Sequence, residues 1–324
     1  MRSRSECQEL AITTELFSLV STKYAKTIDE DRSISSEGYK QILGYRLYYK
    51  SFGNPSSEET VLCLHGGPGS SHVYILPLKD LADHGFRVIF FDQLGCGKSE
   101  FPKNLSLYSI ERGIEEVESI RKSLGLGSIN LLGHSFGGLL AIAYALKYQR
   151  NLKSLITTGG FASVPLLMEE TEKLRNRLPS KIRATLSKYE ESGDYQNPEY
   201  LKAVMTFYRR HLCRLATWPD ELLYDIDHTN QLIYSTMSGP NDLICTGGIK
   251  YWDRTQDLKG IRVPTLVTGG KYDESSPVVA KSIHDGIKGS ELVIFEKSSH
   301  LPMWEERSRY IEVLAKFLTS ITKK

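Results

Sequence analysis

Short apolar runs alternate with amphipathic segments through most of this 324-residue chain. The runs 61–64, 88–91 and 129–132 are continuously apolar, as expected of strands that helices cover on both faces. Between them, apolar residues recur at helical spacing over 74–84 and 110–124. Because strands separated by helices pair in parallel through right-handed crossovers, this pattern predicts an α/β protein with a mostly parallel central sheet and helices on both faces.

The alternation is interrupted once. For almost a hundred residues the sequence is rich in helical patterns, with candidate helices at 169–177, 181–189, 198–210 and 219–225. Strand and helix patterns then resume at 264–268 and 292–295. We therefore predict an N-terminal extension, an α/β core in two parts and an inserted helical cap, at residues 1–34, 35–162 with 253–324, and 163–252, respectively.

Composition excludes several classes of protein. With 41 Lys and Arg against 39 Asp and Glu, the formal charge is only +2, so global charge recruits neither nucleic acid nor an acidic membrane. No run of about 18–20 apolar residues is present, which argues against a spanning helix and favours a cytoplasmic location. The cysteines are far apart and form no CxxC pair, which predicts free thiols at Cys7, Cys63, Cys96, Cys213 and Cys245.

The motif Gly133-His134-Ser135-Phe136-Gly137 follows the apolar run 129–132 and precedes a helical pattern that begins near Gly138. Glycines at the flanking positions permit a tight strand-to-helix turn that lifts a serine hydroxyl out of the sheet. This context favours Ser135 as a catalytic nucleophile. The alternative is a structural turn in which the serine only caps the helix.

A serine hydroxyl needs a histidine to take its proton and a carboxylate to orient that histidine. Asp273 and His300 each follow a predicted parallel strand, 264–268 and 292–295. Functional loops gather at the carboxyl ends of such strands, and the order Ser, Asp, His is that of the α/β-hydrolases. We therefore predict a triad of Ser135, Asp273 and His300, whose activity falls as the pH drops below the histidine pKa, near 6.5 unless shifted.

The segment His65-Gly66-Gly67-Pro68-Gly69 comes directly after the run 61–64. In hydrolases the loop after this strand supplies one oxyanion donor, and the amide that follows the nucleophile supplies another. We nominate the backbone amides of Gly67 and Phe136. A plain Gly-Pro turn is the alternative.

The segment Gly95-Cys96-Gly97-Lys98-Ser99 also follows a predicted strand and ends like a phosphate-binding loop. That loop requires glycine five residues before Gly97, where this chain has Asp92. The sequence therefore argues against nucleotide binding.

Together these motifs resemble the α/β-hydrolase fold and, more narrowly, the proline iminopeptidase (prolyl aminopeptidase) family, in particular its archaeal-type members that act downstream of the tricorn protease. The resemblance spans nearly all of the chain after Tyr45. Its most specific part is the pair formed by Gly-Gly-Pro-Gly and Asp-Gln-x-Gly-x-Gly-x-Ser. The matching segments are 65–69, 92–99, 133–138, 239–242, 272–274 and 300–305.

The resemblance implies two carboxylates that bind the free amine of the substrate. The first maps onto Glu274, beside the triad acid. The second maps onto Asp242 of the cap, where similar relatives carry Glu. A buried ammonium is costly unless it is paired, which gives such anchors an independent physical reason. Aromatic and apolar cap residues either wall the pocket for the first side chain or belong to an ordinary core: Tyr208, Trp218, Tyr224, Tyr234 and Met237.

The implied function is a serine aminopeptidase that releases N-terminal residues, proline and others, from short peptides through an acyl-enzyme on Ser135. This chemistry requires no metal and no organic cofactor, and a larger upstream protease is an expected partner. A carboxylesterase or amino-acid amidase with the same triad is the nearest alternative. A non-catalytic binding protein on a hydrolase fold is the alternative of another class. Epoxide hydrolases and dehalogenases carry Asp at the position of Ser135 and are disfavoured.

Overall fold

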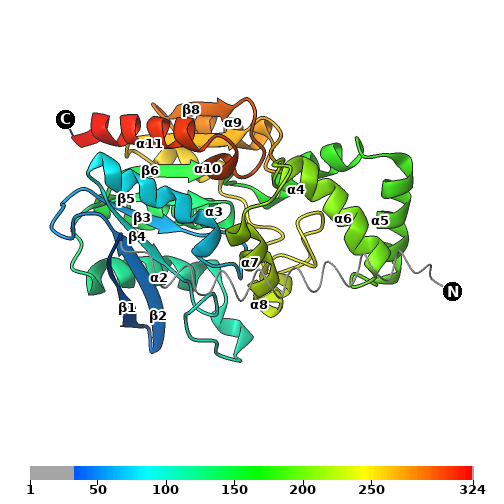
Figure 1. The fold of residues 1–324 in the computed structure, drawn as a ribbon, viewed down its shortest axis with the longest axis horizontal. Helices are drawn as coiled ribbons and strands as arrows, with labels where there is room; N and C mark the ends of the chain where they lie inside the picture. Colours follow the sequence, from blue (N-terminus) through cyan, green and yellow to red (C-terminus); the bar gives the residue numbers. More distant parts are fainter. Residues whose placement is uncertain (1–32, 323–324) are drawn as a thin grey trace.

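A computed structural model describes residues 33–322 of the chain. Within them, eight strands form one sheet in the order β1-β2-β4-β3-β5-β6-β7-β8 (Figure 1). β2 is antiparallel to β1 and β4, and all other neighbours are parallel, which confirms the predicted α/β class. The strands are β1 (Ile34–Ile42), β2 (Tyr45–Phe52), β3 (Thr60–Leu64), β4 (Arg87–Phe91), β5 (Ile129–His134), β6 (Leu152–Thr158), β7 (Thr265–Gly270) and β8 (Glu291–Phe295).

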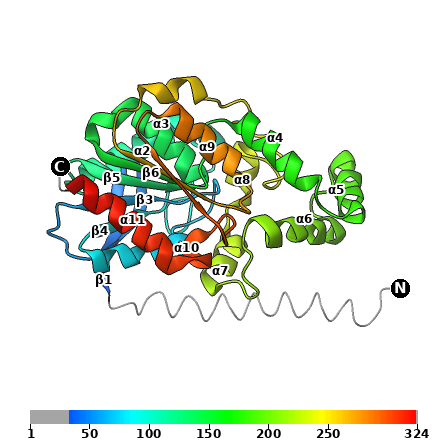
Figure 2. The same ribbon diagram turned by 90° about the horizontal axis from the view of Figure 1, so that it is seen from above.

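Helices cover both faces of the sheet, as predicted (Figure 2). Leu62 and Leu64 of β3 belong to the core on one face, and Val61 and Cys63 to the core on the other. Because every position of a central strand is covered, its sequence is apolar throughout rather than at alternate positions. The first face packs on α2 (Ile110–Ser123), α3 (Phe136–Tyr148) and α9 (Pro277–Gly286), and the second on η1 (Val73–His84) and α11 (Arg307–Thr322).

The segment between β6 and β7 is helical and extends to one side of the sheet (Figure 1). It corresponds to the predicted cap, 163–252, and is called the cap region below. The two ends of the cap region lie side by side: the hydroxyl of Ser163, its first residue, donates to Oδ2 of Asp253, the residue that follows it, at 2.7 Å. The helices are α4 (Val164–Arg175), α5 (Ser180–Ser192), α6 (Pro198–His211), α7 (Asp220–His228) and α8 (Gln231–Met237).

Two helices of the cap region differ from the predictions. α4 begins five residues before the predicted start because the Ser163 hydroxyl caps it by accepting from the Leu166 amide. α8 was missed, since seven residues give too short a pattern; its signal is Asn230, whose side chain accepts from the Leu232 and Ile233 amides. The remaining short helices are η2 (Leu105–Leu107), η3 (Gln149–Asn151), η4 (Thr255–Gly260) and α10 (Pro302–Glu305).

The predicted free thiols are confirmed for the four cysteines that the structure describes, all of them buried. Cys7 and residues 1–32 of the predicted N-terminal extension lie outside the described residues. Among residues 33–322, no helix is both long and apolar enough to cross a membrane.

Candidate active site

Ser135 occupies the turn between β5 and α3. Its backbone has φ +56° and ψ −125°, a conformation that L-residues rarely adopt and that is stored at functional turns. The turn is possible only with glycine beside it: a Cβ on Gly133 would lie 2.0 Å from the Gly137 carbonyl oxygen. α3 begins at Phe136, two residues earlier than predicted, because the chain turns directly into the helix after the serine. The Ser135 side chain is partly exposed, while its neighbours are buried.

His300 and Asp273 form a direct, buried pair. His300 Nδ1 lies 2.6 Å from Asp273 Oδ1, and because a carboxylate only accepts, the ring nitrogen donates. The Ser275 amide also donates to Asp273 Oδ1, at 2.8 Å, which fixes the carboxylate. The imidazole is therefore held with Nε2 directed away from the aspartate, as a proton acceptor requires.

Ser135 lies at the same edge of the sheet as this pair. Its amide donates to the Thr158 carbonyl at 2.9 Å, and an added Cβ on the next residue, Gly159, would lie 2.8 Å from the His300 ring. The described residues include no hydrogen bond from the Ser135 hydroxyl to His300. The structure thus brings the three predicted residues to one place and leaves the Ser135–His300 contact open.

His134 and Tyr74 connect the parts of the site through a continuous set of hydrogen bonds. The Gly66 amide donates to the Tyr74 hydroxyl at 2.7 Å, that hydroxyl contacts His134 Nδ1 at 2.8 Å, and His134 Nε2 contacts the His300 carbonyl at 2.8 Å. A carbonyl only accepts, so Nε2 carries the proton and Nδ1 accepts from Tyr74. Burial lowers the pKa of His134 well below its usual range, which keeps the ring neutral.

This connection was missed at the level of sequence. His134 is an unspecified position of the serine motif, and Tyr74 reads as an apolar residue of a helical pattern. The only available signal is the polar tip of each ring, which must find a partner when it is buried.

The glycine-rich loop 65–72, called the oxyanion loop below, lies beside Ser135. The Phe136 amide belongs to the first turn of α3, where amides have no partner inside the helix. Gly67 has φ +102°, and a Cβ there would lie 2.7 Å from the amide nitrogens of Gly69 and Ser70. The loop can therefore bring backbone amides close to a reacting carbonyl, as the sequence predicts for Gly67 and Phe136.

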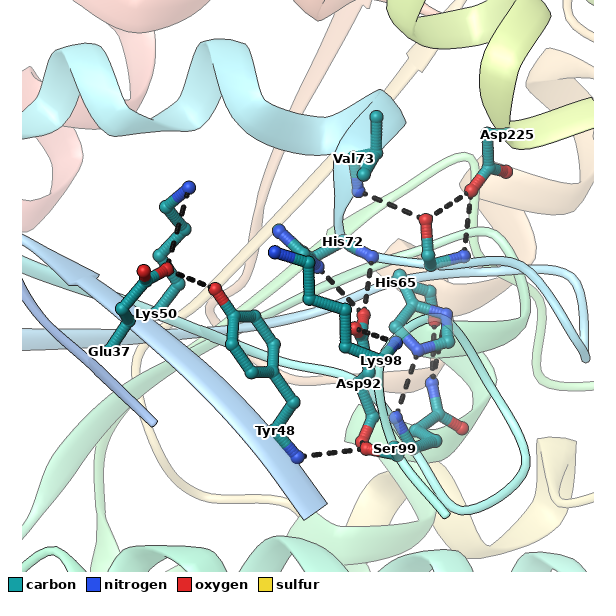
Figure 3. A network of polar contacts seen from close by, with 12 residues as sticks. Glu37, Tyr48, Lys50, His65, His72, Val73, Asp92, Lys98, Ser99 and Asp225 are labelled. Carbon is teal, nitrogen blue, oxygen red and sulfur yellow. Dashed lines mark hydrogen bonds and ion pairs between the residues drawn. The ribbon is translucent and has the colours of Figure 1, made fainter. Parts of the chain in front are cut away.

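Asp92 and Gln93 follow β4 directly and hold both ends of the oxyanion loop; Figure 3 shows Asp92 beside His72. Gln93 Nε2 donates to the His65 carbonyl at 2.9 Å. The His72 amide and ring Nδ1 each lie 2.8 Å from Asp92 Oδ1. The Lys98 amide donates to Asp92 Oδ2 at 2.9 Å, so the segment that resembles a phosphate-binding loop closes on a carboxylate of its own.

Glu274 and Asp242 place two further carboxylates beside His300. Glu274 Oε1 lies 3.6 Å from His300 Nε2, and Glu274 Oε2 is buried without a hydrogen-bond partner among the described residues. Asp242 Oδ1 accepts from the Tyr234 hydroxyl. Burial and the negative charge of Asp242 raise the pKa of Glu274 well above its usual range.

These charges also change the titration of His300. Burial by itself lowers the pKa of the imidazole, but the carboxylates of Asp273 and Glu274 outweigh burial and raise it to about 9. The sequence predicts a pKa near 6.5 unless it is shifted, and the neighbouring carboxylates supply an upward shift. The two carboxylates thus favour the charged form of the imidazole, which would neutralise part of the acidic cluster.

A small cavity of about 30 Å³ lies between the oxyanion loop and α8. Its wall combines core and cap residues, among them Pro68, Phe136, Ile233 and Met237. Of the other aromatic cap residues named from the sequence, Trp218 packs in the core and Tyr224 stacks on His228. Tyr208 and Tyr234 instead face Asp242, and burial together with the charge of Asp242 raises the pKa of both phenols.

Comparison with known proteins places this geometry in a family. The family described as "alpha/beta hydrolase fold" matches residues 59–307. A proline iminopeptidase of Saccharolobus solfataricus is 48% identical over 287 residues, which cover 88% of this chain and 93% of that protein. The crystal structure of VinJ has a TM-score of 0.86 at 32% identity, covering 89% of this chain and 99% of VinJ. A proline iminopeptidase structure from Mycobacterium smegmatis has a TM-score of 0.82 at 28% identity, covering 88% and 98%. This chain belongs to the proline iminopeptidase family of α/β-hydrolases.

Proposed function

We propose that this protein is a serine aminopeptidase that releases N-terminal residues, proline and others, from short peptides. One observation carries the proposal: the buried carboxylate of Glu274 lies 3.6 Å from His300, in a cluster that contains Asp242, and one of its oxygens has no hydrogen-bond partner within residues 33–322. A buried carboxylate oxygen without a hydrogen-bond donor is costly. The protonated amine of a peptide supplies both the positive charge and the donors that the carboxylate lacks.

In the proposed reaction the Ser135 oxygen attacks the first carbonyl carbon of the peptide while His300 Nε2 takes the hydroxyl proton. The amides of Gly67 and Phe136 stabilise the oxyanion, and each such donor contributes about 3–4 kcal/mol in known enzymes. His300 then protonates the leaving amine as the carbon–nitrogen bond breaks. Water repeats the sequence on the acyl-enzyme, releases the amino acid and restores Ser135.

The substrate amine also makes His300 available as a base. In the unliganded protein His300 is the cation nearest to Glu274, and this pairing helps to raise the pKa of the imidazole to about 9. A bound ammonium group takes over the neutralisation of Glu274, so the imidazole pKa falls and the proton leaves. The contact between the Ser135 hydroxyl and His300 forms in the same complex, since such contacts tighten only with substrate bound.

The test compares three substrates: an amino-acid arylamide with a free amine, its N-blocked analogue and a simple ester. We expect preference for the free amine, with proline, alanine, leucine and phenylalanine arylamides defining the range of first residues. Equal turnover of the blocked and free arylamides, or turnover of the ester alone, would instead identify an esterase. A cytoplasmic location and delivery of peptides by a larger protease stay predictions.

A further inference from the structure

A buried carboxylate of the cap region reaches into the oxyanion loop. Asp225 Oδ1, on α7, accepts from the Ser71 amide at 2.8 Å and from the Ser71 hydroxyl at 2.6 Å, although 154 residues separate them in sequence. The Ser71 hydroxyl also lies 3.3 Å from the Val73 amide, at the start of η1 (Figure 3). Asp225 is 4% exposed and Ser71 5%, so water does not replace these bonds.

A second contact from the cap region lies three residues from Gly66. The Asn230 amide donates to the Gly69 carbonyl, and the Asn230 side chain donates to the Gly95 carbonyl, both at 2.9 Å. The two backbones touch, because a Cβ on Gly69 would lie 2.7 Å from the Asn230 carbonyl oxygen. The segment from α7 to α8 therefore holds the outer part of the oxyanion loop at two points.

We propose that Asp225 is a positioning residue for the oxyanion hole: by holding Ser71, it makes a seated cap region a condition for transition-state stabilisation. The inference rests on the proposed acyl-transfer chemistry at Ser135. The core holds the loop at His65, Gly66 and His72, and residues 67–71 lie between these points. Gly67 lies in a stretch with glycine at 66, 67 and 69, so its amide depends on outside contacts for a fixed direction.

The principal test uses Asp225→Ala, with Asp227→Asn as a matched control on the exposed side of α7. For a free-amine arylamide we expect Asp225→Ala to lower kcat about tenfold or more with KM changed less than threefold, because the lost contact acts on the transition state. The control should match the wild type. Unchanged kcat in Asp225→Ala would overturn the proposal.

Inhibitor binding distinguishes a specific effect on the oxyanion hole from a general disturbance of the active-site structure. With an amino aldehyde, Ser135 Oγ adds to the aldehyde carbon, its proton moves to His300, and the former carbonyl oxygen enters the oxyanion hole. Affinity for the aldehyde should fall in parallel with kcat in Asp225→Ala, while affinity for the cyclic amine pyrrolidine, which has no oxygen to place in the oxyanion hole, stays within threefold. Equal loss for both ligands would indicate a structural role and contradict the proposal.

Two milder variants, Asp225→Asn and Ser71→Ala, test the proposal even if Asp225→Ala does not fold. Burial raises the pKa of Asp225 to about 6, and the negative charge of Asp92 adds to the rise. Hydrogen bonds from Ser71 and Ser70 oppose it. Tyr74 and Cys96 are the other titratable groups that interact with the Asp225 carboxylate. The folded state binds that proton more tightly than the unfolded state, so ionisation costs stability as the pH rises from the unfolded value through about 6. Asp225→Asn should therefore keep or raise Tm at pH 7.

Asparagine keeps an acceptor for Ser71 but loses the charge, so Asp225→Asn should have a kcat between those of the wild type and Asp225→Ala. Ser71→Ala should lower kcat less than Asp225→Ala, because the amide contact remains. A lower kcat together with a lower Tm in both variants would contradict positioning. If the wild type cleaves only esters, the proposed aminopeptidase fails, yet the same variants measured on the ester still test Asp225, since both substrates use the oxyanion hole.

Discussion

The two sides of the active site differ in how their polar groups are satisfied. On the reaction side, Gly66, Tyr74 and His134 form neutral hydrogen bonds in which every donor has an acceptor. On the acidic side, burial and the negative charge of Asp242 raise the pKa of Glu274, and one oxygen of Glu274 has no partner among the described residues. The hydrogen bonds of the first side are complete in the protein alone, whereas the proposed function has the ammonium group of the substrate complete the second. Under that proposal, bond cleavage belongs to one side and substrate selection to the other.

Ser135→Ala breaks the reaction side and should have the largest effect. Loss of the nucleophile removes acyl-enzyme formation for every substrate, and comparable replacements lower kcat by about 10⁶-fold. We expect no measurable turnover of arylamide or ester. Near-wild-type thermal unfolding, together with retained binding of the product amino acid, would show that the acidic side survives; residual turnover above a thousandth of wild type would contradict the assignment.

Glu274→Gln breaks the acidic side alone. Leaving one member of a buried ion pair uncompensated costs about 3 kcal/mol or more, so kcat/KM for a free-amine arylamide should fall about 100-fold. An ester without an amine makes no ion pair, so above pH 9, where His300 is largely neutral in both proteins, its kcat/KM should change less than about threefold. Glu296→Gln, at an exposed carboxylate paired with Lys271, is the control and should equal wild type. A similar loss for both substrates would place Glu274 in the reaction rather than in selection.

The pH dependence connects the two sides through His300. With an ester that lacks an amine, kcat/KM reports the free enzyme and should rise with pH through about 9, since His300 must lose its proton to act as a base. With a saturating free-amine substrate, the acid limb of kcat should lie at lower pH, because the ammonium group neutralises Glu274. Parallel pH–rate profiles measure both limbs. Coincident limbs would mean that the substrate amine does not reach the acidic side.

The sequence predicts the catalytic triad better than the residues that position the loops around it. Ser135, Asp273 and His300 each follow an apolar run that identifies a buried strand, so local pattern and sheet geometry together place them at one edge. Asp225 has no such signal: it is one acidic residue among several on a short amphipathic helix, and its partner Ser71 lies 154 residues away. Contacts of this length leave no periodicity in the chain, so only the folded arrangement reveals them.

The same limit applies to charge. From the sequence, His300 takes the ordinary pKa of a histidine, because the residues that shift it come from separate loops. Glu274 is a neighbour of Asp273 in sequence and could be placed beside the triad from the resemblance. Asp242 is separated from Glu274 by 32 positions in sequence, and its effect on the site depends on how α8 and the loop after it pack.

Asp242→Glu gives the smallest expected effect and tests how closely the acidic side fits its ligand. The family resemblance implies Glu at this position in similar relatives, and glutamate carries its carboxylate on a side chain that is longer by a methylene group. We expect KM for a free-amine arylamide to fall two- to fivefold, about 1 kcal/mol or less, with kcat unchanged and ester kinetics unaffected. An increase in KM would mean that the bond from the Tyr234 hydroxyl to Asp242 fixes the carboxylate where aspartate, not glutamate, fits. Asp242 and Tyr234 would then form a matched pair, and the acidic side would be organised before substrate binds, as the reaction side is.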